Sequence, residues 1–373
     1  MKYQKVRLPF KVKKSMLALG SESKNTIAFA EGATVYLSSV HQDLSNLNDF
    51  LVFEQRVKYF LKKRPAVIAY DLHPQYHSSK YALGLASGKR HLTAVQHHHA
   101  HIASCMADNG LKNQKVLGVA FDGTGLGQDD TLWGAEFLIC DYQGFKRMAH
   151  LRPIALLGAE AAIKQPWRLT LMWLFLTYGE RLWDLDIGLI KTLERNKWRV
   201  LKRMYSSGFN SPFSSSMGRL FDAVGALVLN KKEAHFEAEL AIGLERLAAR
   251  CNARTTVYPF KIIKNKEGHI LDPLPMFRAI IADLRHGEPG EKIAYGFHLT
   301  VAEMIKRTLL ILARDNGLNK AVLSGGVFQN RLLCRMITDT LHHEDFQLFL
   351  HRDIPCNDAG ISLGQIAAAN YRN

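Results

Sequence analysis

The residues best suited to chemistry form a run of histidines between an apolar, strand-like segment and a helix-like segment. The run reads His97-His98-His99-Ala100-His101. If residues 98–108 form a helix, side chains four apart share a face, so His97 and His101 can point the same way from its first turn. Two imidazoles at this spacing can take adjacent positions on one metal ion. The alternative is a set of surface or hydrogen-bonded core histidines. His98 and His99 are expected to face elsewhere, behind the ligands or on the surface.

Carboxylates elsewhere in the chain are candidates for the remaining ligands. Asp358 opens the last predicted helix, where an aspartate can complete a site of two histidines and one carboxylate, or can simply cap the helix. Asp122 follows the apolar segment 118–121 and can approach the metal or the reacting group, although an Asp-Gly pair is also a common turn. Asp222 sits on the apolar face of a predicted helix, where a charged group usually needs a partner or a function.

Glycine-rich or polar segments follow several predicted strands, and backbone N–H groups there can receive a phosphate. These segments are residues 20–25, 122–127 and 324–330. The last can hold adenosine, with Asn330 on a sugar hydroxyl, although each segment is also compatible with an ordinary turn. Neither GxxxxGK[ST] nor GxGxxG opens a helix in this sequence, which disfavours a P-loop or Rossmann site.

Two segments of similar layout must position these residues. Residues 16–38 and 115–140 each read as a strand, a polar or Gly-rich turn and a second strand, and the second turn is predicted at residues 122–127. Actin-like ATPases hold a nucleotide between two such hairpins, one from each lobe. Hydrophobic spacing predicts the remaining elements. They are helices over 161–178, 236–250, 294–315, 330–341 and 358–371, strands over 320–323 and 346–350, and a loop over 206–216.

Composition indicates an ordinary soluble globular protein, with 47% hydrophobic and 22% charged residues. Its 373 residues favour two lobes. We predict a basic lead over 1–15, an N-terminal lobe over 16–150 and a C-terminal lobe over 151–373. No stretch has the apolar length of a membrane helix or the apolar core of a signal peptide, so the cytoplasm is the expected location.

Charge and cysteine usage narrow the partners. The net charge of +15 favours an acidic partner, a polyanionic ligand or nucleic acid. The densest basic cluster, residues 191–203, is more simply explained as a solvated helix face. Five scattered cysteines without a CxxC pair argue against a disulfide framework and against a cysteine zinc finger.

Short motifs follow one another from about residue 16 to the end of the chain. They lie at residues 24–26, 71–74, 95–101, 121–125, 132–134, 165–168, 218–224, 324–330 and 357–358. In this order they resemble the C-terminal carbamoyltransferase domain of the hydrogenase maturation factor HypF. Broader relatives of that domain are the tobramycin-type O-carbamoyltransferases and the tRNA threonylcarbamoyltransferases.

The resemblance implies an α/β fold with two lobes of the actin-like (ASKHA) type, duplicated RNase H-like halves and a nucleotide and metal cleft between them. It implies a divalent metal, iron or zinc, held by His97, His101 and Asp358. ATP or carbamoyl-adenylate would occupy the cleft, with magnesium as a further candidate. Catalytic roles would belong to Asp122, Lys24 and Arg168. The nucleotide-binding residues would be Gly20, Ser21, Gly123, Thr124, Gly125, Gly218, Asp222, Gly325, Gly326 and Asn330.

The implied reaction passes a carbamoyl group from carbamoyl-adenylate to the C-terminal cysteine thiol of a HypE-like, acidic protein partner. HypF carries further domains that form the adenylate, and we expect a separate YrdC-like protein to supply it here. Three alternatives stay open. They are an O-carbamoyltransferase acting on a small-molecule hydroxyl, a tRNA-modifying enzyme, and a non-catalytic nucleotide-binding homologue.

Several glycines of the family pattern are replaced by alanine in this chain. Ala135, Ala159 and Ala359 stand at such positions, and the usual Tyr-Glu-Gly-Gln reads Phe236-Glu237-Ala238-Glu239. A methyl group where a backbone must approach closely can narrow the site or change the acceptor.

Overall fold

Two mixed β-sheets form the framework of the molecule. The computed structural model describes residues 3–86, 90–253 and 255–372. The first sheet has the order β1-β5-β4-β2-β7-β8. Its strands are β1 (Tyr3–Arg7), β5 (Thr34–Ser38), β4 (Ala28–Glu31), β2 (Met16–Ala18), β7 (Val67–Asp71) and β8 (His91–Val95). Strand β1, an edge strand paired with β5, lies within the predicted basic lead.

The second sheet repeats this topology. Its main path is β14-β15-β11-β10-β9-β16-β17. Those strands are β14 (Lys261–Asn265), β15 (Gly268–Asp272), β11 (Phe145–Leu151), β10 (Leu132–Cys140), β9 (Val116–Leu126), β16 (Lys320–Ser324) and β17 (Gln347–Phe349). In each sheet three antiparallel strands (β2-β4-β5 and β9-β10-β11) are followed by two parallel ones. This confirms the predicted duplicated, actin-like fold.

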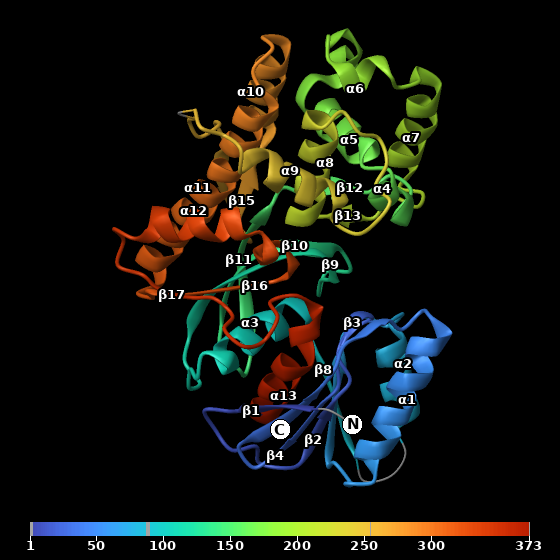
Figure 1. The fold of residues 1–373 in the computed structure, drawn as a ribbon, viewed down its shortest axis with the longest axis vertical. Coiled ribbons are helices and arrows are strands. Elements are labelled where there is room, and N and C mark those ends of the chain that lie inside the picture. Colours follow the sequence, from blue (N-terminus) through green and yellow to red (C-terminus); the bar gives the residue numbers. More distant parts are fainter. Residues whose placement is uncertain (1–2, 87–89, 254, 373) are drawn as a thin grey trace.

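Two buried helices lie between the sheets (Figure 1): α3 (His97–Asp108) and α13 (Ile361–Arg372). Apolar residues of both helices pack into one core with the inner faces of β2, β4, β7 and β9. The outer face of the first sheet is covered by α1 (Leu47–Leu61) and α2 (His77–Gly84). Because α3 is enclosed on both sides, every residue from His97 to Ala107 is buried.

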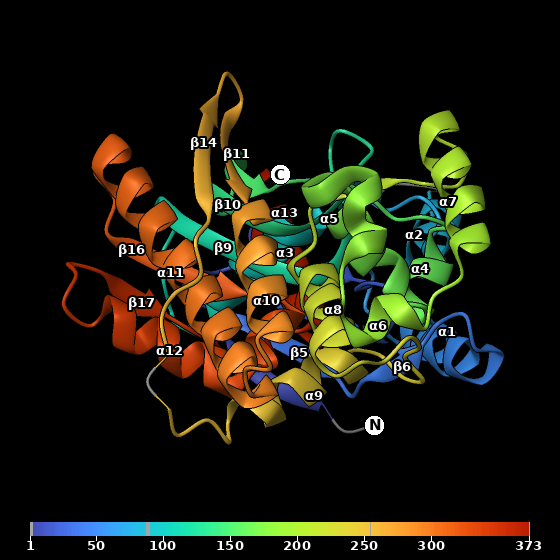
Figure 2. The same cartoon turned by 90° about the horizontal axis from the view of Figure 1, so that it is seen from above.

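Helices on the far side of the second sheet form the largest core, in which α8, α10 and α11 lie over the strands (Figure 2). The helices of this part are α4 (Glu160–Lys164), α5 (Trp167–Tyr178), α6 (Gly188–Lys191), α7 (Arg195–Ser207), α8 (Met217–Val228), α9 (Glu239–Ala248), α10 (Leu274–Arg285), α11 (Gly290–Asn316) and α12 (Arg331–Leu341). Short elements complete the chain: β3 (Ser23–Asn25), β6 (His41–Asp43), β12 (Ile154–Ala155), β13 (Phe213–Ser214), and the 3-10 turns η1 (Gly179–Asp184), η2 (Gly326–Gln329) and η3 (Asp358–Gly360).

Several predicted boundaries differ from the structure. The sheets divide the chain between β8 and β9, whereas the predicted lobe boundary at residue 150 lies within strand β11 of the second sheet. The helix predicted over 161–178 is interrupted at Gln165 and Pro166, since proline lacks the N–H that a helix interior needs. The loop predicted over 206–216 contains the end of α7 and the strand β13.

The turn predicted at 122–127 is wrong. Strand β9 continues to Leu126, and the chain reverses only between Leu126 and Leu132. The ladder instead slips, because Phe121 pairs with Ala135 and Gly125 pairs with Trp133. Residues 122–124 are therefore a bulge opposite one residue of β10, and a bulge re-aims side chains away from the pleat.

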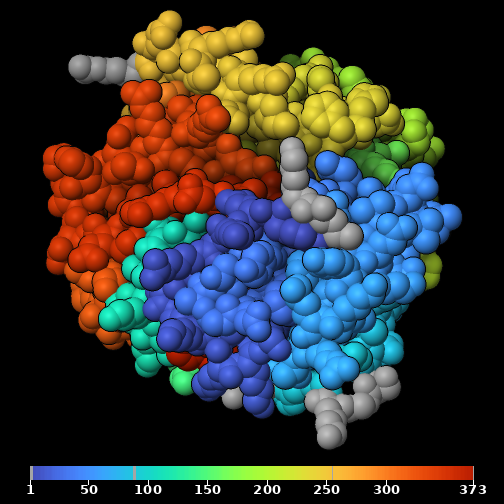
Figure 3. Space-filling model, turned by 60° about the horizontal axis from the view of Figure 1, so that its bottom comes forward, coloured from blue at the N-terminus to red at the C-terminus, as the bar shows by residue number. Residues whose placement is uncertain are grey.

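The lobes touch at the surface as well. In a space-filling view the blue surface of the first lobe adjoins the orange-red C-terminal segment and the yellow segment that follows α8 (Figure 3). All five cysteines lie in the described part of the chain and are unpaired. Among the described helices, none combines the length and the apolar character that a bilayer crossing requires.

Candidate metal and nucleotide site

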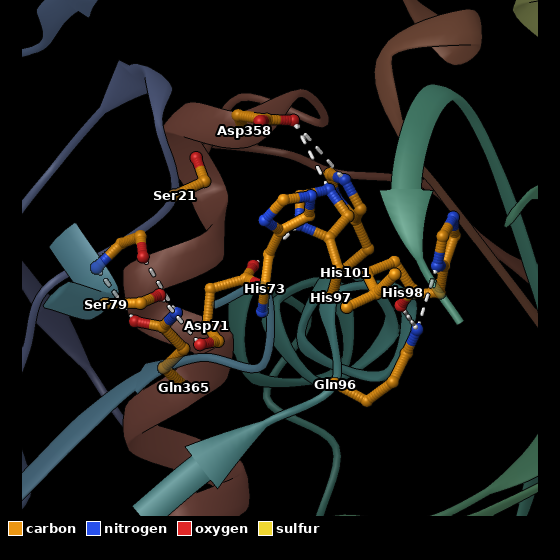
Figure 4. A network of polar contacts seen from close by, with 12 residues as sticks. Ser21, Asp71, His73, Ser79, Gln96, His97, His98, His101, Asp358 and Gln365 are labelled. Atoms are coloured by element: carbon orange, nitrogen blue, oxygen red, sulfur yellow. Dashed lines mark hydrogen bonds and ion pairs between the residues drawn. The ribbon is translucent and has the colours of Figure 1, made fainter. Parts of the chain in front are cut away.

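The histidine pair lies on the first turn of α3, as predicted (Figure 4). Gln96 caps this helix, because its side-chain oxygen accepts a hydrogen bond from the backbone N–H of His99 at 2.9 Å. The rings of His97 and His101 have centroids 4.9 Å apart, and both residues are buried. The alternative of surface histidines is therefore wrong.

Two aspartates complete the cluster. One ligand atom each from His97, His101, Asp122 and Asp358 lies within 4.8 Å of the others. Asp122 Oδ2 is 3.3 Å from His97 Nε2 and 3.4 Å from His101 Nε2. Asp358 Oδ1, on the turn before α13, is 3.7 Å from the same two nitrogens. The structure thus brings together the three predicted ligands and adds Asp122, which the sequence placed near either the metal or the reacting group.

The charges of this cluster favour a cation. Burial opposes a positive charge on His97, but the carboxylates of Asp71 and Asp358 raise its pKa well above the usual range. Burial likewise opposes charging His101, whose pKa is nevertheless raised by Asp122 and Asp358. Burial would raise the pKa of Asp122, yet the two imidazoles hold it well below the usual range. Buried carboxylates need such positive partners, and a divalent cation can replace the two protons.

The donor set itself fits a transition metal. Asp71 Oδ2 lies 2.8 Å from His97 Nδ1, and a carboxylate accepts, so Nδ1 donates and Nε2 is left for a ligand. His101 Nε2 is buried without a hydrogen-bond partner among the described residues. Two imidazole nitrogens and two carboxylate oxygens suit iron or zinc.

The other two histidines point away from the cluster, as predicted, but neither is on the surface. His98 Nδ1 accepts a hydrogen bond from Gln96 at 3.1 Å. His99 Nε2 donates to the backbone oxygen of Asp141 at 2.6 Å, and its Nδ1 accepts from Arg372. Burial first, and then Arg372, lower the pKa of His99 to about 4. Both rings therefore belong to the core around α3.

A cavity of about 290 Å³ begins at Asp122 and extends into the second lobe. It brings together several residues predicted for nucleotide binding, namely Gly123, Gly218, Asp222, Gly326 and Asn330. The backbone N–H of Gly326 donates to Asp122 Oδ1 at 3.0 Å, so one aspartate joins the metal cluster to the cavity. The far end is lined by Ala241, Ile242 and Glu245 of α9.

Contacts with neighbouring residues show how other predicted nucleotide residues shape the site. A Cβ at Gly125 would lie 2.7 Å from the His98 ring and 2.8 Å from the His97 ring, so this glycine makes room for the histidines. Gly325 has a φ of 110° and packs on the backbone of Phe121. Thr124 lies in the bulge of β9. The side-chain oxygen of Asn330 accepts a hydrogen bond from Leu333 N, and its Nδ2 donates to His298 Nε2.

The remaining predicted residues lie in other places. Gly20 N donates to Gln365 in the first lobe, and Figure 4 shows Ser21 between β3 and the turn that carries Asp358. Lys24 Nζ is 2.5 Å from Glu237 Oε2 and so bridges the first lobe to the cavity rim. Arg168 lies outside the cavity, in a groove beside α7, where it donates to Gln165 and to the backbone oxygen of Leu157.

Two residues of the site were assigned no function from the sequence. Asp71 orients His97, and Arg219 lines the cavity. A signal for Asp71 exists, since this aspartate ends the apolar strand β7, and β7 runs parallel to β8, which leads into the histidines. Two of the alanines that replace family glycines, Ala159 and Ala238, have positive φ angles of 50° and 60°. Such angles are costly for residues other than glycine.

Comparison with known proteins identifies the family. Residues 11–108 match the HypF Kae1-like domain, and residues 118–365 match the second subdomain of the carbamoyltransferase Kae1-like domain. The carbamoyltransferase HypF of Synechocystis is 34% identical, over 98% of this chain and 48% of its own length. A HypF homolog from Cupriavidus necator is 32% identical, over 94% of this chain and 90% of its own length.

A solved structure of full-length HypF in a phosphate- and nucleotide-bound form superposes with a TM-score of 0.91 at 37% identity. It is matched over 98% of this chain and 57% of that one. The chain thus spans about half the length of the Synechocystis relative. Its two matched regions, its fold and these identities agree, and the chain belongs to the HypF family through the Kae1-like carbamoyltransferase domain.

Proposed function

We propose that this chain is a carbamoyltransferase that moves a carbamoyl group from carbamoyl-adenylate to the C-terminal cysteine thiol of a HypE-like protein during hydrogenase maturation. One observation carries the proposal: a four-residue metal-ligand cluster and a nucleotide-sized cavity share Asp122. The family membership and the names of the relatives support it. A YrdC-like activity would supply the adenylate, and the net charge of +15 suits an acidic acceptor.

Different residues along the cavity would bind different parts of the nucleotide. Asp222 and Asn330 would bind the ribose, and the apolar side chains of α9 would face the base. The backbone at Gly123 and Gly326 would lie against the phosphate, because these positions have no side chain to exclude it. His97, His101, Asp122 and Asp358 would hold the metal, with Asp71 fixing the tautomer of His97.

When bound, iron or zinc would act as a Lewis acid toward the acyl phosphate. The acceptor thiol would lose its proton to solvent, and its sulfur would attack the carbamoyl carbon. A C–S bond forms while the C–O bond to the phosphate breaks, and AMP leaves with that electron pair. Because Asp122 belongs to both the cluster and the cavity, the acyl phosphate would lie at the junction of the two.

A reconstituted transfer assay tests this function. The protein is given carbamoyl-adenylate made in place by a YrdC-like enzyme, together with a HypE-like acceptor, and the mass of the acceptor is followed. We expect one added carbamoyl group, and we expect the His97→Ala and His101→Ala variants to lose both the transfer and the bound metal. Arg203→Gln, on the exposed face of α7, is the matched control.

The other outcomes of the assay identify the alternatives. Transfer only to a small-molecule hydroxyl, or only with tRNA present, would replace the proposed acceptor. Nucleotide binding without transfer to any acceptor would indicate a non-catalytic homologue. Unchanged metal content in both histidine variants would refute the metal site.

A further inference from the structure

The walls of the nucleotide cavity are strongly acidic. Its carboxylates come from Asp122, Asp222, Glu237 and Glu245. Among the described residues that line it, Arg219 is the one cation. A nucleotide carries negative charge on its phosphate, and such a charge in a confined site needs a positive partner. Arg219 is therefore the lining residue that can neutralise a phosphate.

Arg219 is buried but incompletely paired. The residue is 6% exposed, and neither its Nε nor its Nη1 has a hydrogen-bond partner among the described residues. Its Nη1 lies 2.9 Å from Asp222 Oδ2, an ion pair without hydrogen-bond geometry. A buried guanidinium has five N–H donors, and leaving them unused is costly. Unused donors of this kind are expected where a ligand supplies the acceptors.

The position of Arg219 is fixed at the boundary between the cluster and the cavity. Its backbone N–H donates to the hydroxyl of Ser216, whose single proton faces the backbone oxygens of both Asp122 and Gly123. A Cβ at Gly123 would lie 3.4 Å from Arg219 Nη2, so the guanidinium lies against this glycine. A Cβ at Gly218 would come within 3.0 Å of the Gly123 Cα. The first turn of α8 therefore packs tightly against the bulge that carries Asp122.

We propose that Arg219 binds the phosphate of the nucleotide and sets the preference of the cavity for nucleotides over nucleosides. This rests on the proposed function. The planar guanidinium can offer paired N–H groups to two phosphate oxygens. It would also stabilise the charge of the AMP leaving group, while Asp222 holds it in place and faces the ribose. The simpler alternative is that Arg219 only neutralises Asp222.

Binding of AMP and of adenosine separates these two roles. Titration calorimetry with the protein as purified compares wild type with Arg219→Gln, Arg219→Lys and the control Arg203→Gln. We expect Arg219→Gln to weaken AMP binding by at least about tenfold while adenosine binding changes by less than about twofold. Arg219→Lys keeps the positive charge but loses the paired N–H groups of the guanidinium. Its AMP affinity should therefore lie between those of wild type and Arg219→Gln.

Each result decides the question. Retained adenosine binding shows that the Arg219→Gln cavity is folded, and selective loss of AMP then supports the phosphate role. Equal weakening of both ligands in both Arg219 variants, or no weakening of AMP, would overturn it. A wild-type protein that binds neither ligand would instead refute the proposed nucleotide cavity, and with it this inference.

Discussion

Gly364 of α13 is the position where a single methyl group should most disturb the metal site. A Cβ built there would lie 1.8 Å from the backbone oxygen of Ala100, which stands between the two histidines on α3. Contacts of a Cβ below 3.0 Å are essentially never observed, so the helices would have to separate by about 1.2 Å. Because the obstacle is backbone, no rotamer change can relieve it. We expect Gly364→Ala to destabilise the protein by about 3 kcal/mol, the upper part of the usual range for overpacking.

The same movement should weaken metal binding. Asp358 precedes α13 whereas His97 and His101 lie on α3, and metal–ligand distances tolerate only about 0.2 Å. Urea unfolding and metal titration of Gly364→Ala measure both effects. Gly84→Ala is the matched control, since it ends α2 with no atom within 4 Å of the added methyl. It should raise stability by about 0.5–1 kcal/mol. A Gly364→Ala variant with wild-type unfolding and metal affinity would refute this packing argument.

Three further predictions concern the surroundings of the site. Asp71→Asn should lower metal affinity about 10- to 100-fold in a chelator competition, because His97 loses its orienting carboxylate; an unchanged affinity would contradict the role of Asp71. In chelator-treated protein, the raised pKa values of His97 and His101 stabilise the folded state. This stabilisation is complete below the unfolded pKa of 6.5, and it is lost as the pH rises through the pKa values of the folded state. Urea midpoints from pH 6 to 9 should therefore fall without metal but not with it, and parallel curves would count against the assignment. Ala159→Gly should stabilise the fold by about 1 kcal/mol in the same measurement, since Ala159 has φ 50° and ψ −111°; a loss of stability would show that this backbone relaxes.

Lobe contacts and loops were the least predictable part of the fold. The strands at the two ends of residues 16–38 and the helices over 294–315 and 330–341 follow from hydrophobic spacing, and the structure has them, but the predicted polar turn at 20–25 contains the short strand β3. The turn at 122–127 could not be read correctly, because glycines mark both turns and bulges, and the strand partner decides between them. The lobe boundary depended equally on which strands pair, and strand pairing is not a local property.

The sequence by itself determined the histidine pair. Four-residue spacing on a helix determines which side chains share a face, so His97 and His101 must lie side by side once α3 forms. Tertiary structure alone decided what meets them. Asp122 reaches the pair through a slipped β ladder, Asp71 through the neighbouring parallel strand, and Asp358 through the packing of α13 on α3. Helix periodicity is a local property. The positions of the three aspartates depend instead on sheet register and on glycine contacts between distant segments, which local sequence patterns do not reveal.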